Sequence, residues 1–350
     1  MIIIQETIRV MVVMGAAFVL ALLVTPVWLR FLENYKVGKQ IRPSEKAPVF
    51  NHFHEKKAGT PTAGGVIIWG TVIGIALLLS LLSYFFGDIW SSFSFIDRRE
   101  TYLPLAALLI AALLGLMDDL LGSLGIGANG GGFKVRYKLI IYFFIALIGA
   151  WWFYDRLGFR EIAIPFAPDF VLGIWYIPVF IFVIVASAFS ANETDGLDGL
   201  LGGTSLFTFG ALTVVAFALG RYDLATFGGA MIGSLLAFLW HNIYPARFFM
   251  GDTGSMSLGI TMGVIAMLTN TVLLLPLFAF IPVLESLSVI IQLTSKKAFG
   301  RKIFHSTPLH HHFEALHWHE SKVTMRFWII SAMASGLGLV IFFLARLFSV

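Results

Sequence analysis

Apolar runs long enough to cross a lipid bilayer recur along this chain, and no other feature of the sequence constrains its fold as strongly. A helix needs about 20 mostly apolar residues to span the hydrocarbon core. Hydrophobic residues make up 58% of the chain and charged residues 13%, which excludes an ordinary soluble domain. We therefore predict an all-α polytopic membrane protein in which residues 1–350 form a single integral membrane domain.

The pattern predicts about ten transmembrane helices. The apolar runs lie at 10–32, 63–86, 102–117, 138–154, 171–191, 200–219, 224–243, 255–270, 272–294 and 324–347. With ten crossings, both termini lie on one side of the membrane. The loops expected on the other side are 33–62, 118–137, 192–199, 244–254 and 295–323.

Positive charge is distributed unequally between the two sides. Seven of the 24 Lys and Arg residues lie on the side of the termini, and the other 17 lie in or beside the five loops. Those seven are Arg9, Arg98, Arg99, Arg156, Arg160, Arg221 and Arg346. Because cytoplasmic loops carry an excess of Lys and Arg, the five loops are predicted to be cytoplasmic and both termini extracytoplasmic. All nine histidines and the Asp-rich motifs fall in or next to the same loops, which predicts an active site on the cytoplasmic face.

The most polar of these loops is 192–199, Asn-Glu-Thr-Asp-Gly-Leu-Asp-Gly. It places Glu193, Asp195 and Asp198 between two runs that are almost entirely apolar. Carboxylates beside membrane segments are costly and usually mark a site that holds a cation or a phosphate. The alternative is a solvated turn between two helices, where Asp and Gly are common.

Two further Asp motifs fall on the same side. Asp118 and Asp119 end one apolar run, where they face the unfavourable negative end of a helix dipole. Adjacent carboxylates repel each other, which suits one of them binding a divalent cation while the other acts as a base or orients a partner. Asp252 lies between two glycines just before another run, and it could bind a metal that bridges phosphate oxygens or could cap a helix.

Three consecutive histidines, His310, His311 and His312, lie in a basic loop. Three neighbours on a regular helix cannot converge on one ion, and the chain has no cysteine, so phosphate binding is favoured over a zinc site. A histidine-rich loop without a role is the alternative. Glu285, inside an apolar run, could relay protons or satisfy backbone groups of a proline-broken helix, and we favour the structural role.

Together these motifs resemble those of the phospho-N-acetylmuramoyl-pentapeptide transferase family, within the superfamily of polyprenyl-phosphate N-acetylhexosamine-1-phosphate transferases. The resemblance covers essentially the whole chain in order. The segments that carry it are 59–65 (GTPTAGG), 117–120 (MDDL), 195–200 (DGLDGL), 249–255 (FMGDTGS), 285–292 (ESLSVIIQ) and 308–313 (PLHHHF).

The resemblance implies a Mg²⁺-dependent enzyme of the bacterial cytoplasmic membrane, with ten helices, termini outside and a homodimeric assembly. It implies transfer of phospho-MurNAc-pentapeptide from UDP-MurNAc-pentapeptide to undecaprenyl phosphate, which gives lipid I and UMP for peptidoglycan synthesis. The expected partners are the two substrates and the lipid bilayer, and no nucleic acid is expected.

The resemblance also assigns site residues. Asp252 would bind Mg²⁺, and Asp118 is the favoured candidate for activating the lipid phosphate. The catalytic set that it implies is Asp118, Asp119, Asn192, Asp195, Asp252 and His311. The substrate-binding set is Lys57, Thr62, Gly196, Leu197, Asp198, Phe249, Gln292, His310 and His312, of which Lys57, Gly196, Leu197, Asp198 and Phe249 match the uridine pocket.

The sequence departs from the family pattern at two positions. Phe189 stands where an Asn is usual, and Glu193 stands where an apolar residue is usual. The polar contact of the missing Asn must come from elsewhere. Glu193 adds negative charge near the expected metal.

Several readings stay open on the sequence alone. The favoured reaction is a single displacement by the lipid phosphate, and a two-step route with Asp252 as nucleophile is the alternative. A related transferase that uses a UDP-N-acetylhexosamine is a second candidate function. A secondary transporter is a third, although transporters bind near the midplane and contain related halves, whereas these polar motifs lie at one face.

Overall fold

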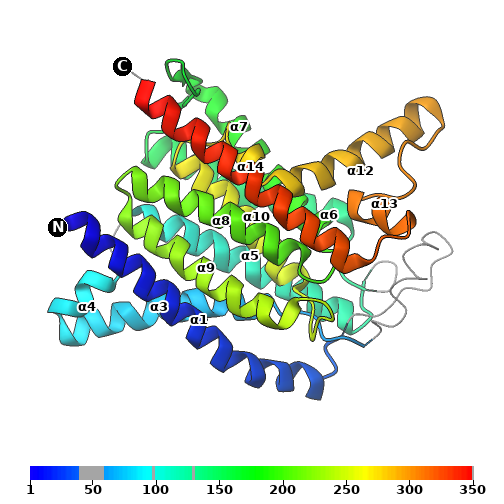
Figure 1. Cartoon of the computed structure of the whole chain (residues 1–350), viewed down its shortest axis with the longest axis horizontal. Coiled ribbons are helices and arrows are strands. Elements are labelled where there is room, and N and C mark those ends of the chain that lie inside the picture. Colours follow the sequence, from blue (N-terminus) through cyan, green and yellow to red (C-terminus); the bar gives the residue numbers. More distant parts are fainter. Residues whose placement is uncertain (39–58, 97–98, 128–130, 349–350) are drawn as a thin grey trace.

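The computed structural model describes residues 1–38, 59–96, 99–127 and 131–348, and these form a bundle of helices (Figure 1). The only strands in the described part are β1 (Glu161–Ile162) and β2 (Phe170–Val171), which pair antiparallel. The longer helices are α1 (Ile2–Asn34), α3 (Val66–Phe86), α5 (Arg99–Ser123), α6 (Val135–Trp151), α7 (Tyr176–Thr194), α8 (Leu200–Ala218), α9 (Tyr222–Asn242), α10 (Gly251–Leu268), α12 (Phe280–Phe299) and α14 (Glu320–Phe348). The short ones are α4 (Asp88–Phe93), α11 (Leu275–Phe278), α13 (Leu309–Ala315), a π-helical turn (Trp152–Arg156) and a 3₁₀ turn (Gly173–Trp175).

Within the described residues, eight helical segments are long and apolar enough to cross a membrane. This confirms a predominantly helical, multi-pass membrane protein. The two remaining predicted spans correspond to α10 and α12, which carry more polar residues. The count of ten and the sidedness of the termini therefore stay predictions.

One predicted helix differs from the structure. The run 272–294 was expected to form one span, but it is divided at Ala279 into α11 and α12. Pro282 has no N–H to donate to the carbonyl of Phe278 four residues earlier. The hydroxyls of Thr208 and Ser335 donate to that carbonyl instead, at 2.8 and 3.0 Å. Neighbouring helices thus satisfy the backbone at the break, and α12 extends away from the bundle (Figure 1).

Helix α10 lies at the centre of the bundle and is buried along nearly its whole length. Glycines permit its close approach to its neighbours. A Cβ at Gly115 of α5 would lie 2.3 Å from the carbonyl oxygen of Asp252, and one at Gly259 would lie 2.6 Å from that of Ser187 in α7. The backbone just before α3 also pairs with the segment before α10, since the amides of Gly64 and Gly65 donate to Phe249 and Met250 at 2.8 Å.

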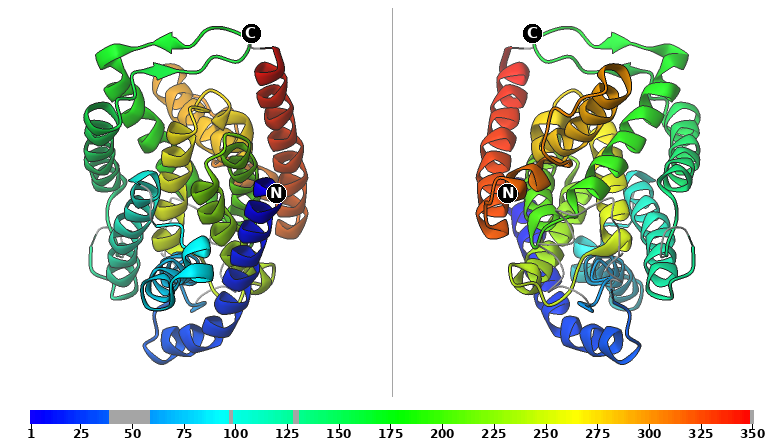
Figure 2. Two further views of the ribbon diagram at one scale, coloured as in Figure 1. Left: turned by 90° about the vertical axis from the view of Figure 1, so that its left-hand side faces the viewer. Right: turned by 90° about the vertical axis from the view of Figure 1, so that its right-hand side faces the viewer.

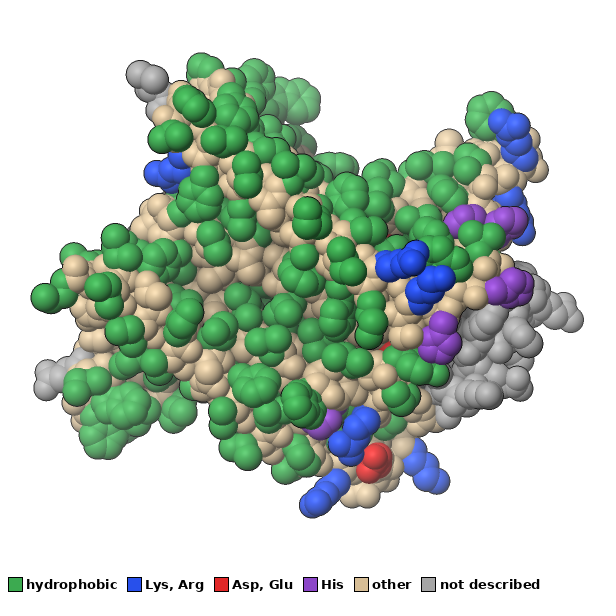
Figure 3. All heavy atoms as spheres, viewed as in Figure 1, with side chains coloured by type: hydrophobic (Ala, Val, Ile, Leu, Met, Phe, Trp, Pro, Cys, Tyr) green, Lys and Arg blue, Asp and Glu red, His purple; other side chains and the backbone are tan. Residues whose placement is uncertain are grey.

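The two ends of the bundle differ. The N-terminus and the end of α14 lie at one end, and α13 lies at the other, as Figures 1 and 2 show. Apolar side chains cover most of the face in Figure 3, whereas Lys, Arg and His gather toward the end that carries α13. This distribution is expected of a membrane protein whose sides contact lipid and whose charged residues gather at one end of the bundle.

We predict that Gly65→Ala lowers the thermal stability of the purified protein, because its Cβ would lie 2.3 Å from the Cα of Gly254. Overpacking of this kind costs about 1–3 kcal/mol. Gly74→Ala is the matched control, since Gly74 lies inside α3 and a Cβ there has nothing within 4 Å. Thermal unfolding in detergent measures both, and equal melting temperatures would contradict the close packing of α3 on α10.

Candidate active site

Three charged side chains from three helices meet at the α13-bearing end of the bundle. Lys138, in the first turns of α6, extends its ammonium to 3.0 Å from Oδ2 of Asp118 in α5 and also contacts Oδ2 of Asp252 in α10. The side chains of Lys138, Asp118 and Asp252 are 14%, 6% and 18% exposed. One positive charge therefore serves two largely buried carboxylates that would otherwise repel each other.

Asp119 has a different role from its neighbour. Its two carboxylate oxygens accept the backbone amides of Asp252 and Thr253 at 2.9 and 3.0 Å. Those amides belong to the first turn of α10, where helical N–H groups lack internal partners and negative charge is favoured. Asp119 thus caps α10 and fixes where Asp252 lies. Gly251 has a φ of +75°, and a Cβ there would lie 2.4 Å from Asp119.

Asn192, near the end of α7, completes the cluster. Its side-chain amide donates to Oδ1 of Asp252 at 2.6 Å and to the hydroxyl of Ser255 at 3.0 Å. On the other side, the backbone amide of Phe133 donates to Asp118. Lys138, Asn192 and Phe133 therefore orient the two carboxylates.

The donor chemistry of this cluster suits Mg²⁺. Among the described residues, no group of three His, Cys, Asp or Glu side chains forms an all-protein metal site. Mg²⁺ does not need one, because it usually binds one or two carboxylates together with substrate phosphates and water. A carboxylate offers about four lone-pair positions, so Asp118 and Asp252 keep acceptor capacity beyond the contacts to Lys138 and Asn192.

The loop after α7 is largely anchored by its own contacts. Asp198 accepts the backbone amide of Ala246 at 2.9 Å, and its own amide donates to Glu320 at 2.9 Å. Leu197 is buried in an apolar cluster with Ile281 and Phe327. Of the predicted nucleotide-binding residues in this loop, Leu197 and Asp198 are therefore buried and only Gly196 is partly accessible.

His310 is buried against this loop. Its Nδ1 lies 3.2 Å from Oε2 of Glu285, and its backbone amide donates to both oxygens of the same carboxylate at 3.2 Å. A Cβ on Gly196 would lie 2.1 Å from Nε2 of His310. Glu285 therefore anchors α13 to α12, a structural contact, although the backbone that it satisfies is that of α13 and not that of the broken helix.

The other two histidines of the motif are half-buried. Nδ1 of His311 lies 2.6 Å from the buried carboxylate of Glu314, whereas Nδ1 of His312 accepts the backbone amide of His305 at 3.2 Å. Gln292 is buried beneath this segment. Its amide accepts from the backbone N–H groups of Ile303 and Phe304 and donates to the carbonyl of Phe304, so it shapes the segment before α13.

Glu193 is half-buried and follows Asn192 directly in α7. It is close enough to interact electrostatically with His310, with Glu285 and with Lys138. The structure thus connects the Asp-rich motifs to the histidine motif through the residue at which the sequence departs from the family pattern.

None of the contacts to the carboxylates of Asp118 and Asp252 described above involves the remaining predicted site residues. Asp195, half-buried, ends α7. Thr62 is buried and its backbone amide donates to Val37 at 3.0 Å, while the amide of Phe249 donates to Pro61 at 2.8 Å. Lys57 lies outside the described residues.

Sequence reasoning missed Lys138. The residue was counted only as one of the positive charges that orient the chain, because it begins the apolar run 138–154. A lysine at the start of a membrane helix usually extends to the lipid interface. Its partners are 20 and 114 residues away in sequence, so no local pattern reveals the pairing.

The chain is similar to known proteins over nearly its whole length. Residues 102–270 match the model of glycosyl transferase family 4. A phospho-N-acetylmuramoyl-pentapeptide-transferase of Chloroflexus aurantiacus is 37% identical over 97% of this chain and 90% of its own length. Proteins of the same name from Anoxybacillus flavithermus and Clostridium novyi are each 37% identical, over 93% and 92% of this chain and 96% and 93% of their own lengths.

Lys138→Met should destabilise the protein strongly at neutral pH, because it leaves Asp118 and Asp252 together without their shared cation. Removing one partner of a buried ion pair costs about 3–5 kcal/mol. Adding Asp252→Asn to Lys138→Met should restore part of that loss. Lys134→Met is the control, since Lys134 is an exposed residue at the start of the same helix and should change stability by less than about 0.5 kcal/mol. Equal unfolding temperatures for the two single variants would contradict the shared-cation arrangement.

The ion pair of His310 should make stability depend on pH. Burial is the largest single influence on the pKa of His310 and lowers it, but the charge and hydrogen bond of Glu285, together with the charges of Glu314 and Glu193, outweigh burial, so this pKa lies above its ordinary value of 6.5. A histidine whose pKa is higher in the folded state than in the unfolded chain stabilises the folded state. This stabilisation is complete when the pH lies below the pKa of the unfolded chain, and it is lost as the pH rises through the pKa of the folded state. Glu285→Gln should therefore lower the melting temperature most at about pH 6 and least at about pH 9. Glu161→Gln, exposed in β1, is the control, and a loss independent of pH would show that His310 is not charged.

Proposed function

Because the chain belongs to the phospho-N-acetylmuramoyl-pentapeptide transferase family, we propose that it transfers phospho-MurNAc-pentapeptide from UDP-MurNAc-pentapeptide to undecaprenyl phosphate. Membership makes the chain a multi-pass membrane glycosyl-phosphate transferase of peptidoglycan synthesis. The products of the proposed reaction are lipid I and UMP. The proposed location is the bacterial cytoplasmic membrane, with the site facing the cytoplasm and the protein acting as a homodimer.

The cluster of Asp118, Lys138 and Asp252 is the observation that supports this reaction. A lipid phosphate that attacks a diphosphate brings several negative charges together, so positioning and neutralisation carry most of the catalysis. The cluster supplies a fixed ammonium ion and acidic oxygens at one end of a membrane bundle. Hydrogen bonds and ion pairs from neighbouring segments fix the cluster, so its charges are preorganised for phosphoryl transfer.

We propose that Asp252 holds Mg²⁺, while Asp118 beside it is left to act on the lipid phosphate. When bound, Mg²⁺ would neutralise phosphate oxygens and polarise the phosphorus to be attacked. Lys138 keeps both carboxylates in position and adds positive charge beside the phosphates. Asn192 fixes the orientation of Asp252 through its 2.6 Å hydrogen bond.

Asp118 is proposed to orient the lipid phosphate and accept its proton before a single displacement at the β-phosphorus. Phe133 and Lys138 hold its carboxylate in place. Asp119 is a positioning residue, because both of its oxygens are occupied by the first turn of α10. A two-step route with Asp252 as nucleophile is the alternative.

The loop 195–199 and the histidine segment are proposed to bind the donor. Gly196, Phe249, Asp195, His311 and His312 are only partly buried, so their atoms remain accessible to a nucleotide or phosphate. Leu197, Asp198, Gln292, Thr62 and His310 are buried and would shape the pocket from behind. Lys57 retains its proposed role in the uridine pocket.

Two other functions were considered. A related transferase that consumes a UDP-N-acetylhexosamine would use the same cluster, so only the donor distinguishes it. Family membership sets the transporter hypothesis aside, and the charged residues of the site gather at one end of the bundle, whereas transporters bind near the midplane.

The test is release of UMP from UDP-MurNAc-pentapeptide in the presence of Mg²⁺ and undecaprenyl phosphate. Asp118→Asn and Asp252→Asn should each lower turnover by about 10²-fold or more, because each removes charge that orients or neutralises the reacting phosphates. Asp155→Asn is the control, since Asp155 is exposed in the π-helical turn after α6 and pairs only with its neighbour Arg156 among the described residues.

Two outcomes would contradict the proposal. Normal turnover in both Asn variants would show that the cluster is not the site. Consumption of UDP-N-acetylglucosamine while UDP-MurNAc-pentapeptide is ignored would show that the donor is wrong.

A further inference from the structure

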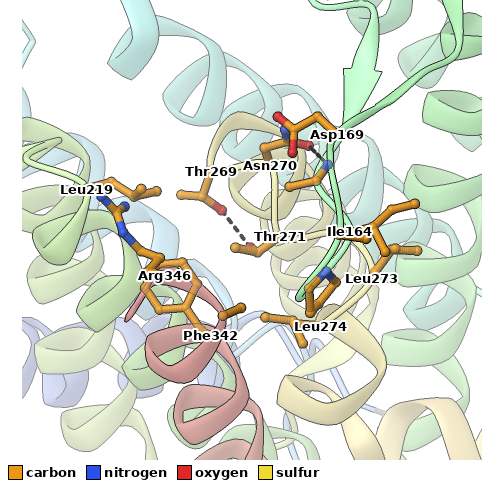
Figure 4. Close-up of a pocket in the computed structure, with 14 residues that line it drawn as sticks. Ile164, Asp169, Leu219, Thr269, Asn270, Thr271, Leu273, Leu274, Phe342 and Arg346 are labelled. Carbon is orange, nitrogen blue, oxygen red and sulfur yellow. Dashed lines mark hydrogen bonds between the residues drawn. The ribbon is translucent and has the colours of Figure 1, made fainter. Parts of the chain in front are cut away.

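A pocket of about 280 Å³ lies at the end of the bundle opposite the candidate active site (Figure 4). Its walls come from the β1–β2 hairpin, the turn after α10 and the end of α14. We call it the hairpin pocket. Ile164, Asp169, Thr271, Leu273, Phe342 and Arg346 are among its lining residues.

The walls of the hairpin pocket are fixed by hydrogen bonds. Asn270, in a left-handed conformation with a φ of +53°, accepts the backbone amide of Ala163 at 3.0 Å and so joins the hairpin to the turn after α10. The hydroxyls of Thr269 and Thr271 lie 2.8 Å apart, and that of Thr269 also donates to the carbonyl of Ile265. The pocket is therefore built into the fold.

Two opposite charges lie on different walls of this pocket. Arg346 comes from the last turn of α14, and Asp169 comes from the residue just before β2 (Figure 4). Both are exposed, and neither forms an ion pair within residues 1–38, 59–96, 99–127 and 131–348. The guanidinium of Arg346 lies 5.9 Å from the ring centroid of Phe342. Two separate, opposite charges of this kind can pair with a ligand that carries one negative and one positive group.

The pocket lies where long apolar helices end. Leu219 follows α8, Thr269 follows α10, and Arg346 is two residues before the end of α14. The exposed side chain of Leu273 lines it and would contact acyl chains. Charged residues at such helix ends meet lipid headgroups at the membrane interface.

We propose that the hairpin pocket binds the headgroup of an amine-bearing phospholipid. The phosphate pairs with Arg346 and the ammonium with Asp169, while the acyl chains lie along Leu273 and the end of α14. The volume of about 280 Å³ lies close to the lower end of the roughly 300–1,000 Å³ typical of small-molecule sites, which suits a small polar headgroup.

Native mass spectrometry of the full chain in detergent tests this site with three probes: phosphatidylethanolamine, phosphatidylglycerol and free phosphoethanolamine. The unmodified protein should retain phosphatidylethanolamine more strongly than phosphatidylglycerol, because only the former offers an ammonium to Asp169. Asp169→Asn should remove that preference. Arg346→Ala should weaken retention of both lipids about fivefold, as expected for one Arg at an interface.

Controls separate this site from general lipid adhesion. Arg156→Ala removes an exposed arginine after α6, away from the pocket, and should leave retention unchanged. Arg346→Lys keeps the charge and should retain more lipid than Arg346→Ala, and UMP release by each variant reports that the protein is folded.

The proposal fails if the unmodified protein retains both lipids equally or if Arg346→Ala retains them normally. Binding of free phosphoethanolamine as tight as that of the whole lipid would also overturn it, because the pocket would then be a site for a soluble ligand.

Discussion

The sharing of one ammonium ion by two carboxylates is the interaction on which the working end of this protein depends. Lys138 lies between Asp118 and Asp252, so α5, α6 and α10 must end near one point. Two acidic groups this close would otherwise take up a proton or move apart. The glycine contacts of α10 serve the same requirement, since a Cβ at Gly115 would separate α5 from the first turn of α10.

The adjacent residues Asp118 and Asp119 have different roles in the cluster. Asp118 contacts the ammonium of Lys138 and a single backbone amide, that of Phe133, whereas both oxygens of Asp119 accept backbone amides of α10. Asp118 therefore keeps acceptor capacity for a further partner, whereas Asp119 is committed to the first turn of α10. Chemistry and architecture are thus divided between two neighbouring positions of one helix.

Much of the fold was predictable because the bilayer restricts the possible structures to helices with a recognisable length and composition. The eight candidate spans among the described residues all fall on predicted apolar runs. The sequence suggested a helix broken by proline, but not that the span would be divided at Ala279, because Pro282 alone is also compatible with a kinked continuous helix. The break is stable only because Thr208 and Ser335, on α8 and α14, satisfy the carbonyl of Phe278. The acidic motifs of the site could be recognised from the sequence, because carboxylates beside membrane segments are energetically costly and therefore unusual. Lys138 could not, because lysine is common at the end of a membrane helix.

The three histidines of the motif differ in burial, since His310 is buried and His311 and His312 are half-buried. His310 is enclosed by Glu285 and Gly196, so its imidazole cannot meet a substrate without moving α13. His311 and His312 remain partly accessible, and their orientation depends on where His310 is anchored. Glu193 lies within electrostatic reach of both His310 and Lys138, so a change of charge at either residue alters the electrostatic potential at Glu193.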